Sequence, residues 1–431
     1  MRECEKRQND SMETAIFTAG LLYFAGHVLT RIFERSKIPD VLLLIIIGIV
    51  LGPITGLSTV EEIGATGRIF TQFALIIILF EGGLGLELGT LIHSARQSSI
   101  LTVVFFFLSV TVVAVIMHYG FEYSTLSSVL TGFICGGTSS AVVIPLLSKI
   151  RATPTANAML VLESALTDVL CIVFSIGVLQ SIESGAFSVG KVAGALITSL
   201  VMATVVGVIC GGLWLRLLPF VRKFPNTQFA TCFYMFMVYG VTEMLDFSGA
   251  IAVLAFGIVI GNAPNLSRHV RDLLGENTVG IVTDIEKEVY KELAFLVKIF
   301  FFIYLGISIP FEDLDVIIVS GLVVVALFMI RPLAARFFAG RKTTAHDRTI
   351  IAVMLPKGLA AAVLAGLPIQ YEMAEGQDIQ AITYYVVLLS ILTTSVLIPI
   401  VERTKVGKFY DRMFGCGTEA TTENNKEQNE E

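Results

Sequence analysis

The stretch from Ala156 to Gln180 is apolar enough to cross a bilayer, yet it carries four polar side chains near its centre, Glu163, Ser164, Thr167 and Asp168. A carboxylate at the middle of a transmembrane helix costs roughly 2.5–3.5 kcal/mol on insertion scales, so it normally faces protein or water and has a function. Because a helix turns by about 100° per residue, Ser164 and Asp168 share one face, whereas Glu163 points elsewhere and needs its own partner. The pattern favours a cation and proton site centred on Asp168; the alternative is a set of structural ion pairs in a helical bundle.

The composition is that of an integral membrane protein. Of the 431 residues, 55% are hydrophobic and 15% are charged, against about 25% charged residues in soluble proteins. The apolar runs are long and lack the alternation of barrel strands, which predicts an all-α fold. The six cysteines show no CxxC or His/Cys ligand spacing. We therefore expect no cofactor, and we expect no nucleic-acid partner.

Apolar segments of sufficient length predict thirteen transmembrane spans. No small-residue cleavage site follows the first segment, so we interpret it as a retained helix rather than a signal peptide. The expected spans are 15–34, 41–58, 68–87, 98–118, 125–147, 156–180, 190–216, 227–245, 248–263, 291–310, 314–336, 347–369 and 379–402.

Lysine and arginine residues are distributed unevenly between the two sides that these spans define. One side holds 23 of the 30, the other side holds five, and the last two, Lys298 and Lys357, lie within spans. Because cytoplasmic segments carry an excess of positive charge, the N-terminus is predicted outside and the C-terminus in the cytoplasm. We expect a polar N-terminus over 1–14, a transmembrane domain over 15–402 in the plasma membrane, and a disordered cytoplasmic tail over 403–431.

Two spans carry helix-breaking sequences at membrane depth. The span 125–147 contains CGGTSSAVVIP, and the span 347–369 contains MLPKGLAAAV, in which Lys357 is flanked by proline and glycine. Unwound backbone is tolerated in a membrane only where it lines a cavity or is buried in protein. The two spans are seven apart, so they cross in opposite directions, which indicates inverted repeats with a midplane site made by discontinuous helices.

Three further charged residues lie at or near membrane depth. Glu81 is expected either to line a vestibule or to cap its helix. Lys298 is expected to extend its ammonium group towards the cytoplasmic face. Arg331 follows an apolar run and cannot lose its proton, so it requires a buried acidic partner, for which Glu163, Asp168 and Glu81 are the candidates.

Several of these segments resemble a known family. ESALTD, which ends at Asp168, is similar to the ES-x-x-ND signature of the cation/proton antiporter superfamily, in particular its NhaP and sodium/proton exchanger branch. LFEGGL, GTSSAVVIPLL, SGAIAVLAFGIVIGN at 248–262, FFIYLGISI at 301–309 and LPKG at 355–358 also occur in the order of that family. The resemblance covers about residues 15–402.

The resemblance implies a thirteen-helix protomer of a homodimer. Six helices would form a mobile core around two crossed discontinuous helices, and the others would form a dimerisation domain past which the core moves in alternating access. By position in the sequence, Asp168 resembles the carboxylate that binds cation and proton in turn, and Ser164 resembles a cation ligand. Glu163 and Arg331 resemble the structural ion pair of the core.

The chain departs from the family pattern at three places. Thr138-Ser139-Ser140 stands where the family usually has Thr-Asp-Pro, Thr167 stands in place of the Asn before the Asp, and Lys357 stands in place of Arg. These departures concern the choice of cation and the response to pH more than the class of transporter. A second branch, which resembles potassium efflux systems, tolerates hydroxyl-rich breaks, so a K+/H+ antiporter is the alternative.

The chemistry of these residues predicts exchange of a monovalent cation, Na+ or Li+, for H+. Oxygen ligands for the cation are expected from Asp168, Ser164, Thr167 and the backbone freed at Thr138 and Ser139. Proton and cation compete for one carboxylate because each neutralises it, so exchange follows if only loaded sites cross the membrane. Since Thr167 cannot hold a second proton, we expect an electroneutral one-to-one cycle that serves pH and cation homeostasis.

Lys357 is expected to interact with helix dipoles at the breaks rather than to carry a second proton.

An intramembrane aspartyl protease needs two apposed carboxylates, whereas Glu163 and Asp168 lie on divergent faces of one helix, so we expect no enzyme. An ion channel is the alternative of another class, because broken helices also build selectivity filters.

Overall fold

The computed structural model describes residues 20, 23–24, 26–28, 31, 39–57, 60–85, 88–147, 150, 152–183, 189–225, 227–265, 282–311, 313–338 and 343–403. Regular secondary structure within these residues is helical throughout, which confirms the expected all-α fold. The expected N-terminal segment 1–14, most of the first span at 15–34 and the tail beyond residue 403 lie outside the described residues.

Each expected span from 41–58 onward corresponds to one helix or to a set of consecutive shorter helices. The two spans with helix-breaking sequences are divided, the first into α5 and α6 and the second into α14, α15 and α16. In chain order the helices are α2 (Asp40–Ile49), η1 (Val50–Ile54), α3 (Val60–Gly85), α4 (Leu88–Val115), η2 (Ile116–Gly120), α5 (Thr125–Gly136), α6 (Ser140–Leu147), α7 (Pro154–Glu183), α8 (Val189–Val221), α9 (Ala230–Met244), α10 (Gly249–Gly261), η3 (Ala263–Asn265), α12 (Asp284–Ile307), α13 (Leu314–Phe338), α14 (Ala345–Val353), α15 (Leu359–Leu364), α16 (Leu367–Gln370) and α17 (Gly376–Arg403).

Five helical segments among the described residues are long and apolar enough to cross a membrane. They are Ile100–Gly120, Pro154–Gln180, Val201–Val221, Leu314–Phe337 and Gly376–Val401. Shorter apolar helices accompany them, and α5, with 12 residues, is an example. A helix of that size is about 18 Å long, roughly half the thickness of a bilayer, so it needs a second half-helix to complete the crossing.

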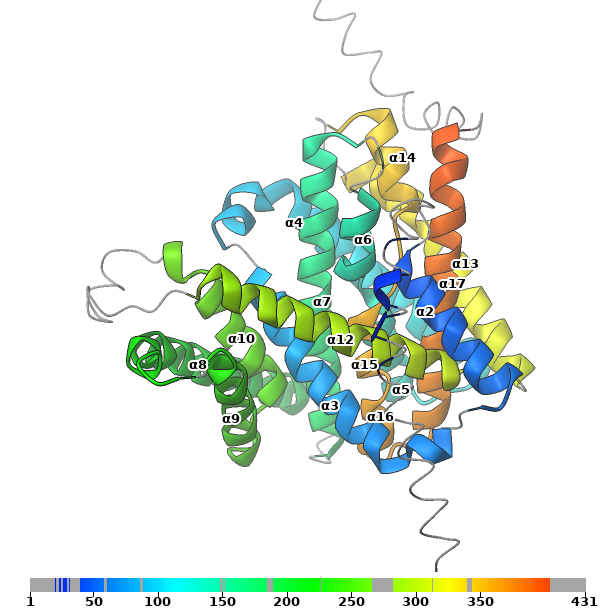
Figure 1. Cartoon of the computed structure of the whole chain (residues 1–431). Coiled ribbons are helices and arrows are strands. Elements are labelled where there is room, and N and C mark those ends of the chain that lie inside the picture. Colours follow the sequence, from blue (N-terminus) through cyan, green and yellow to red (C-terminus); the bar gives the residue numbers. More distant parts are fainter. Residues whose placement is uncertain are drawn as a thin grey trace, which may run out of the picture.

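The helices form two bundles (Figure 1). In the first bundle, α10 packs against α3, α8 and α9, and α12 packs against α2 and α3. In the second bundle, α4 packs against α5, α7 and α13, α7 also contacts α6 and α15, and α13 packs against α14 and α17. Contacts between the bundles are sparser, apart from the one between the consecutive helices α7 and α8. In the view of Figure 1, α8 and α9 lie on the left, α13 and α17 lie on the right, and α7 lies between them.

The second bundle combines a unit from each half of the chain. One unit runs from α4 to α7 and the other from α13 to α17, and each has a broken span between two continuous ones. Two such units with the broken span in the same position are the arrangement expected for inverted repeats around a midplane site.

The first bundle contains helix contacts that are too close for any residue larger than glycine. A Cβ atom on Gly257 of α10 would lie 2.6 Å from the carbonyl oxygen of Phe80 in α3, and one on Gly207 of α8 would overlap the carbonyl oxygen of Ala252 in α10. Membrane helices associate through such close packing, because lipid tails are as apolar as the side chains that they would replace. The first bundle is therefore well suited to be a rigid scaffold.

The second bundle brings its two helix breaks into direct contact. The chain is non-helical at 137–139, between α5 and α6, and at 354–358, between α14 and α15. The buried backbone N–H of Ser139 donates a hydrogen bond of 2.8 Å to the carbonyl oxygen of Pro356. A Cβ atom on Gly358 would overlap the side chain of Ser139, so the approach of the two chains requires glycine there. The breaks thus satisfy part of each other's freed backbone, as buried unwound segments must.

Gly358→Ala is expected to destabilise the protein, because the added methyl group would push the two breaks apart. Overpacking of this kind typically costs about 1–3 kcal/mol. The apparent melting temperature of the purified variant in detergent should therefore fall. Gly321→Ala in α13 is the matched control, since nothing lies within 4 Å of its Cβ position, and alanine favours a helix. Gly358→Ala protein that melts like the wild type would contradict the close contact between the two breaks.

Candidate cation and proton site

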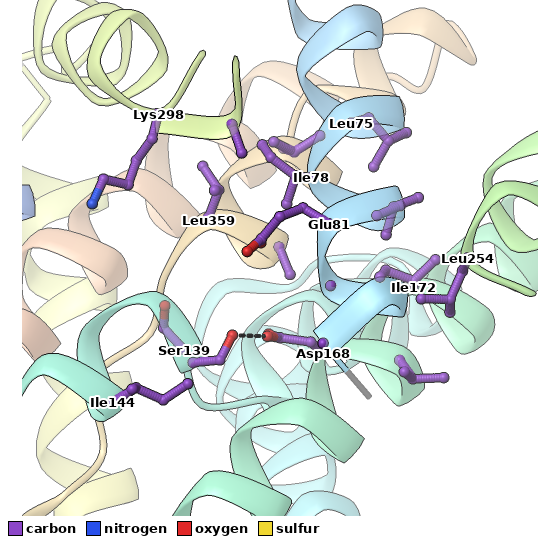
Figure 2. Close-up of a pocket in the computed structure, with 18 of the residues that line it drawn as sticks. Leu75, Ile78, Glu81, Ser139, Ile144, Asp168, Ile172, Leu254, Lys298 and Leu359 are labelled. Atoms are coloured by element: carbon purple, nitrogen blue, oxygen red, sulfur yellow. Dashed lines mark hydrogen bonds between the residues drawn. The ribbon is translucent and has the colours of Figure 1, made fainter. Parts of the chain in front are cut away.

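The half-buried Asp168 of α7 lines a cavity of about 410 Å³ between the two bundles. The first bundle contributes Glu81 from α3 and Lys298 from α12, and the second contributes Asp168 together with Ser139 and Ser140 of the first break. Figure 2 shows Glu81 pointing into the cavity from the wall opposite Asp168. Most other lining residues are apolar. A few convergent polar groups in an apolar wall are typical of a ligand site.

Ser140 is the direct partner of Asp168. Its hydroxyl group, at the first residue of α6, donates a hydrogen bond of 2.9 Å to Oδ2 of Asp168, which is the dashed line that ends at Asp168 in Figure 2. From the sequence we expected oxygen ligands at Thr138 and Ser139 but not at the next residue. A signal existed, because helix N-termini favour hydroxyl side chains and anions, and Ser140 begins the half-helix that follows the break.

Thr138 and Thr167 hold the first break against α7. The backbone N–H of Thr138 donates to Oγ1 of Thr167 over 3.0 Å, and the hydroxyl of Thr167 donates to the carbonyl oxygen of Ser164 over 3.2 Å. Both threonines are buried, and neither lines the cavity that contains Asp168. Their hydroxyl groups therefore contact the backbone and each other rather than the cavity.

Ser164 is also buried behind the cavity wall. Its hydroxyl group donates to the carbonyl oxygen of Val161, within the same helix, over 3.0 Å. Of the five residues expected to provide cation ligands, the structure brings two to the cavity, Asp168 and Ser139, and places the other three in the interior behind it.

Lys357 lies in the second break, next to the contact between the two breaks, and is only 1% exposed. Its ammonium group donates to the carbonyl oxygen of Gly136, at the end of α5, over 3.3 Å. Its backbone N–H donates to Oγ of Ser390 over 2.9 Å. A helix C-terminus carries partial negative charge and stabilises a cation, so this geometry matches the expected interaction of Lys357 with a helix dipole.

Glu163 and Arg331 form a bidentate ion pair inside the second bundle. Nη2 of Arg331 donates to Oε2 of Glu163 over 2.7 Å, and Nη1 donates to Oε1. Nε of Arg331 donates to the carbonyl oxygen of Ile351 in α14 over 2.9 Å, and the guanidinium lies 4.3 Å from the ring centre of Phe105 in α4. One arginine therefore connects α13 to α7, α14 and α4. Of the carboxylates that the sequence left open as its partner, the structure selects Glu163.

Lys298 has a partner that was not expected from the sequence. Its Nζ lies 2.9 Å from Oδ2 of Asp40, the first residue of α2, and both side chains are largely buried. The ammonium group therefore ends in an ion pair within the first bundle, instead of extending unpaired to the cytoplasmic face. Glu81 lines the cavity, which is one of the two positions expected for it.

The fold and the site together define a class of protein. Two discontinuous helices whose breaks hydrogen-bond to each other, a similar unit from each half of the chain, and a carboxylate facing a cavity between two bundles are the architecture of a secondary transporter. The chain belongs to the transmembrane sodium/hydrogen exchanger family, whose model matches residues 20–403.

Individual relatives agree with this assignment. The chain is similar to Na+/H+ antiporter 1 of Methanocaldococcus jannaschii, with 26% identity over 365 residues that cover 81% of this chain and 82% of that protein. It is similar to the K+/H+ antiporter NhaP2 of Shewanella oneidensis, with 22% identity over 89% of this chain, and it spans 65% of that protein's length. The structure of the sodium proton antiporter MjNhaP1 from M. jannaschii at pH 8 matches with a TM-score of 0.71 and 22% identity, covering 89% of this chain and 97% of that one, and so shows the same fold.

Glu163→Ala and Arg331→Ala should each destabilise the protein by roughly 3–5 kcal/mol, because each leaves a buried charge unpaired. The double variant should lose less than the sum, since it leaves neither charge behind. Apparent melting temperatures in detergent measure the three losses. Asp284→Ala and Lys287→Ala, which separate an exposed pair on α12, are the controls and should have little effect. Losses that simply add would show that Glu163 and Arg331 are not energetically coupled.

Proposed function

We propose that the protein exchanges a monovalent cation, Na+ or Li+, for protons across the plasma membrane. The observation that carries this proposal is the position of Asp168, a mid-helix carboxylate that faces a cavity between two helix bundles. A single carboxylate in such a place binds either a proton or a cation, because each neutralises the same charge. Membership of the sodium/hydrogen exchanger family supports the assignment, and the relatives with printed functions are antiporters rather than enzymes.

The proposed cation site is built from oxygen atoms around Asp168, the ligand type that hard cations prefer. Asp168 and Ser139 meet the cation at the cavity wall. Thr138, Thr167 and Ser164 lie directly behind this wall and are linked to one another by hydrogen bonds. In our proposal these three supply further oxygen atoms when the break adjusts around the bound ion.

The two bundles supply the movement in this proposal. Because the contacts between them are sparser than those within them and the site lies at their boundary, the second bundle moves past the first and exposes Asp168 to one side at a time. We propose that the N-terminus is outside and the C-terminus is cytoplasmic. In that proposed orientation the cavity faces the cytoplasm, because its lining includes Gly85, at the end of α3, and Lys291, in the early part of α12.

We further propose that the first bundle forms the dimerisation domain of a homodimer. Its helices α8 and α9 expose many large apolar side chains, among them Ile209, Phe220, Phe233 and Met237. Apolar surface of this extent needs lipid or a second copy of the chain to cover it. The proposal assigns part of the surface to the second copy and the rest to the bilayer.

A K+/H+ antiporter is the second candidate. The first break carries three consecutive hydroxyl residues, Thr138, Ser139 and Ser140, a composition that the potassium-type branch tolerates. The Shewanella relative is a K+/H+ antiporter, which supports the hypothesis that this chain exchanges K+ for H+. Na+ and K+ therefore both belong in the assay that follows.

Asp168→Asn is expected to abolish exchange, because an amide neither ionises nor binds a proton at physiological pH. Proteoliposomes loaded with a pH-sensitive dye should report proton movement on addition of Na+, Li+ or K+ to the wild-type protein and none with the variant. Asp315→Asn, an exposed residue in the first turn of α13, is the matched control and should retain exchange. Wild-type rates from Asp168→Asn protein would contradict the mechanism, and cation flux without proton movement would indicate a channel.

The exchange equilibrium is expected to be independent of voltage, because Glu163 is committed to Arg331 and we assign the exchanged proton or cation to Asp168 alone. With the voltage clamped by K+ and valinomycin, the Na+ or Li+ gradient that stops net proton flux should be the same at every voltage. A gradient that moves with voltage would contradict one-to-one exchange and implicate Lys357. Lys357→Arg, which cannot release a proton, would then restore voltage independence.

A further inference from the structure

Ser140 makes two contacts with the carboxylate of Asp168. Its hydroxyl donates a hydrogen bond of 2.9 Å to Oδ2, and its backbone N–H faces the same carboxylate. Ser140 is the first residue of α6, and the N–H groups of a first helical turn have no partner within their own helix. A side chain of α7 therefore caps the N-terminus of α6 at the point where the cation is proposed to bind.

The hydroxyl group can adapt to each state of this carboxylate, because it has one hydrogen to donate and two lone pairs to offer. It donates to the charged, empty carboxylate, as in the structure. When a cation binds at Asp168, rotation about the Cβ–Oγ bond of Ser140 turns the hydrogen away and presents a lone pair to the ion. When Asp168 is protonated, the same lone pair accepts the carboxyl hydrogen.

We propose that Ser140 is a ligand-supplying and selectivity-determining residue of the transport site, which holds a small cation between its hydroxyl oxygen and Oδ2 of Asp168. This inference rests on the proposed cation/proton exchange. The two oxygen atoms are already 2.9 Å apart, so a small ion binds between them with little rearrangement, whereas a larger ion forces them apart. Ser140 therefore favours Na+ and Li+ over K+, since cavity size and ligand number set selectivity between cations.

Serine at position 140 differs from the residue that the family usually has there. The family that the chain resembles usually has proline there, and proline has neither a hydroxyl group nor a backbone N–H to offer a carboxylate. This chain has Ser139 where that family has an acidic residue. Ser140 thus adds an oxygen ligand next to a position that has lost one.

The test measures the apparent KM and the maximal rate of exchange for Na+, Li+ and K+ at one fixed pH in proteoliposomes. Ser140→Ala should raise the KM for Na+ by about tenfold, the effect of losing a contact worth about 1.4 kcal/mol, with little change in maximal rate. The KM for K+ should rise less, so that the preference for Na+ over K+ falls. Ser140→Thr keeps the hydroxyl group and should retain the wild-type KM. Ser395→Ala is the control, because that hydroxyl donates to Ile391 within α17.

Ser140→Pro is a second variant that leaves α6 free to form, because proline is well tolerated at the first helical position. It should raise the KM for Na+ at least as much as alanine does. Wild-type KM values in both variants, with an active wild-type protein, would overturn the role of Ser140 and leave the proposed exchange intact. Equal increases in the KM for Na+ and the KM for K+ would overturn the role of Ser140 in selectivity. A wild-type protein that moves no protons with any cation would overturn the proposed function itself.

Discussion

The structure depends on keeping one ionisable carboxylate, that of Asp168, in contact with solvent at the middle of a membrane domain. A charge in the hydrocarbon core is costly, so the surrounding protein has to replace the water that solvates it elsewhere. The cavity between the bundles provides access, and the hydroxyl of Ser140 provides a donor. An unbroken helix has no free backbone N–H groups at its middle, and this is the physical reason for interrupting the fifth span at this depth.

Three other charged groups in the membrane domain, those of Glu163, Lys298 and Lys357, have partners, and this bears on what Asp168 can do. Glu163 bonds to Arg331, Lys298 bonds to Asp40, and Lys357 bonds to the carbonyl group at the end of α5. Within the part of the chain that the structure describes, Asp168 takes part in no ion pair. Its charge is therefore free to be neutralised by a proton or a cation, which is the chemical requirement for exchanging one for the other.

Packing differs between the bundles in a way that suits transport. The first bundle has helix contacts that only glycine permits, as at Gly257, and such contacts resist relative movement. The second bundle is tied together by polar bonds through its centre, where Arg331 joins four helices and the two breaks hydrogen-bond to each other. Each bundle is thus internally cohesive, and the boundary between them contains the cavity. Movement of one whole bundle against the other disturbs fewer contacts than deformation within either.

The sequence by itself determined the all-helical fold, the helices that correspond to the expected spans from 41–58 onward, the two helix breaks and the mid-helix position of Asp168, because apolar length and helix-breaking residues are local properties of the chain. It narrowed the partner of Arg331 to three carboxylates, but only the tertiary structure selected Glu163. Helical spacing pointed to Ser164 as the neighbour of Asp168, yet the group that bonds to Asp168 is the hydroxyl of Ser140, from 28 residues away, and Ser164 bonds within its own helix. The period of a helix determines which of its own residues share a face, whereas the neighbour that covers that face depends on how separate helices pack, and no local pattern in the sequence encodes that choice.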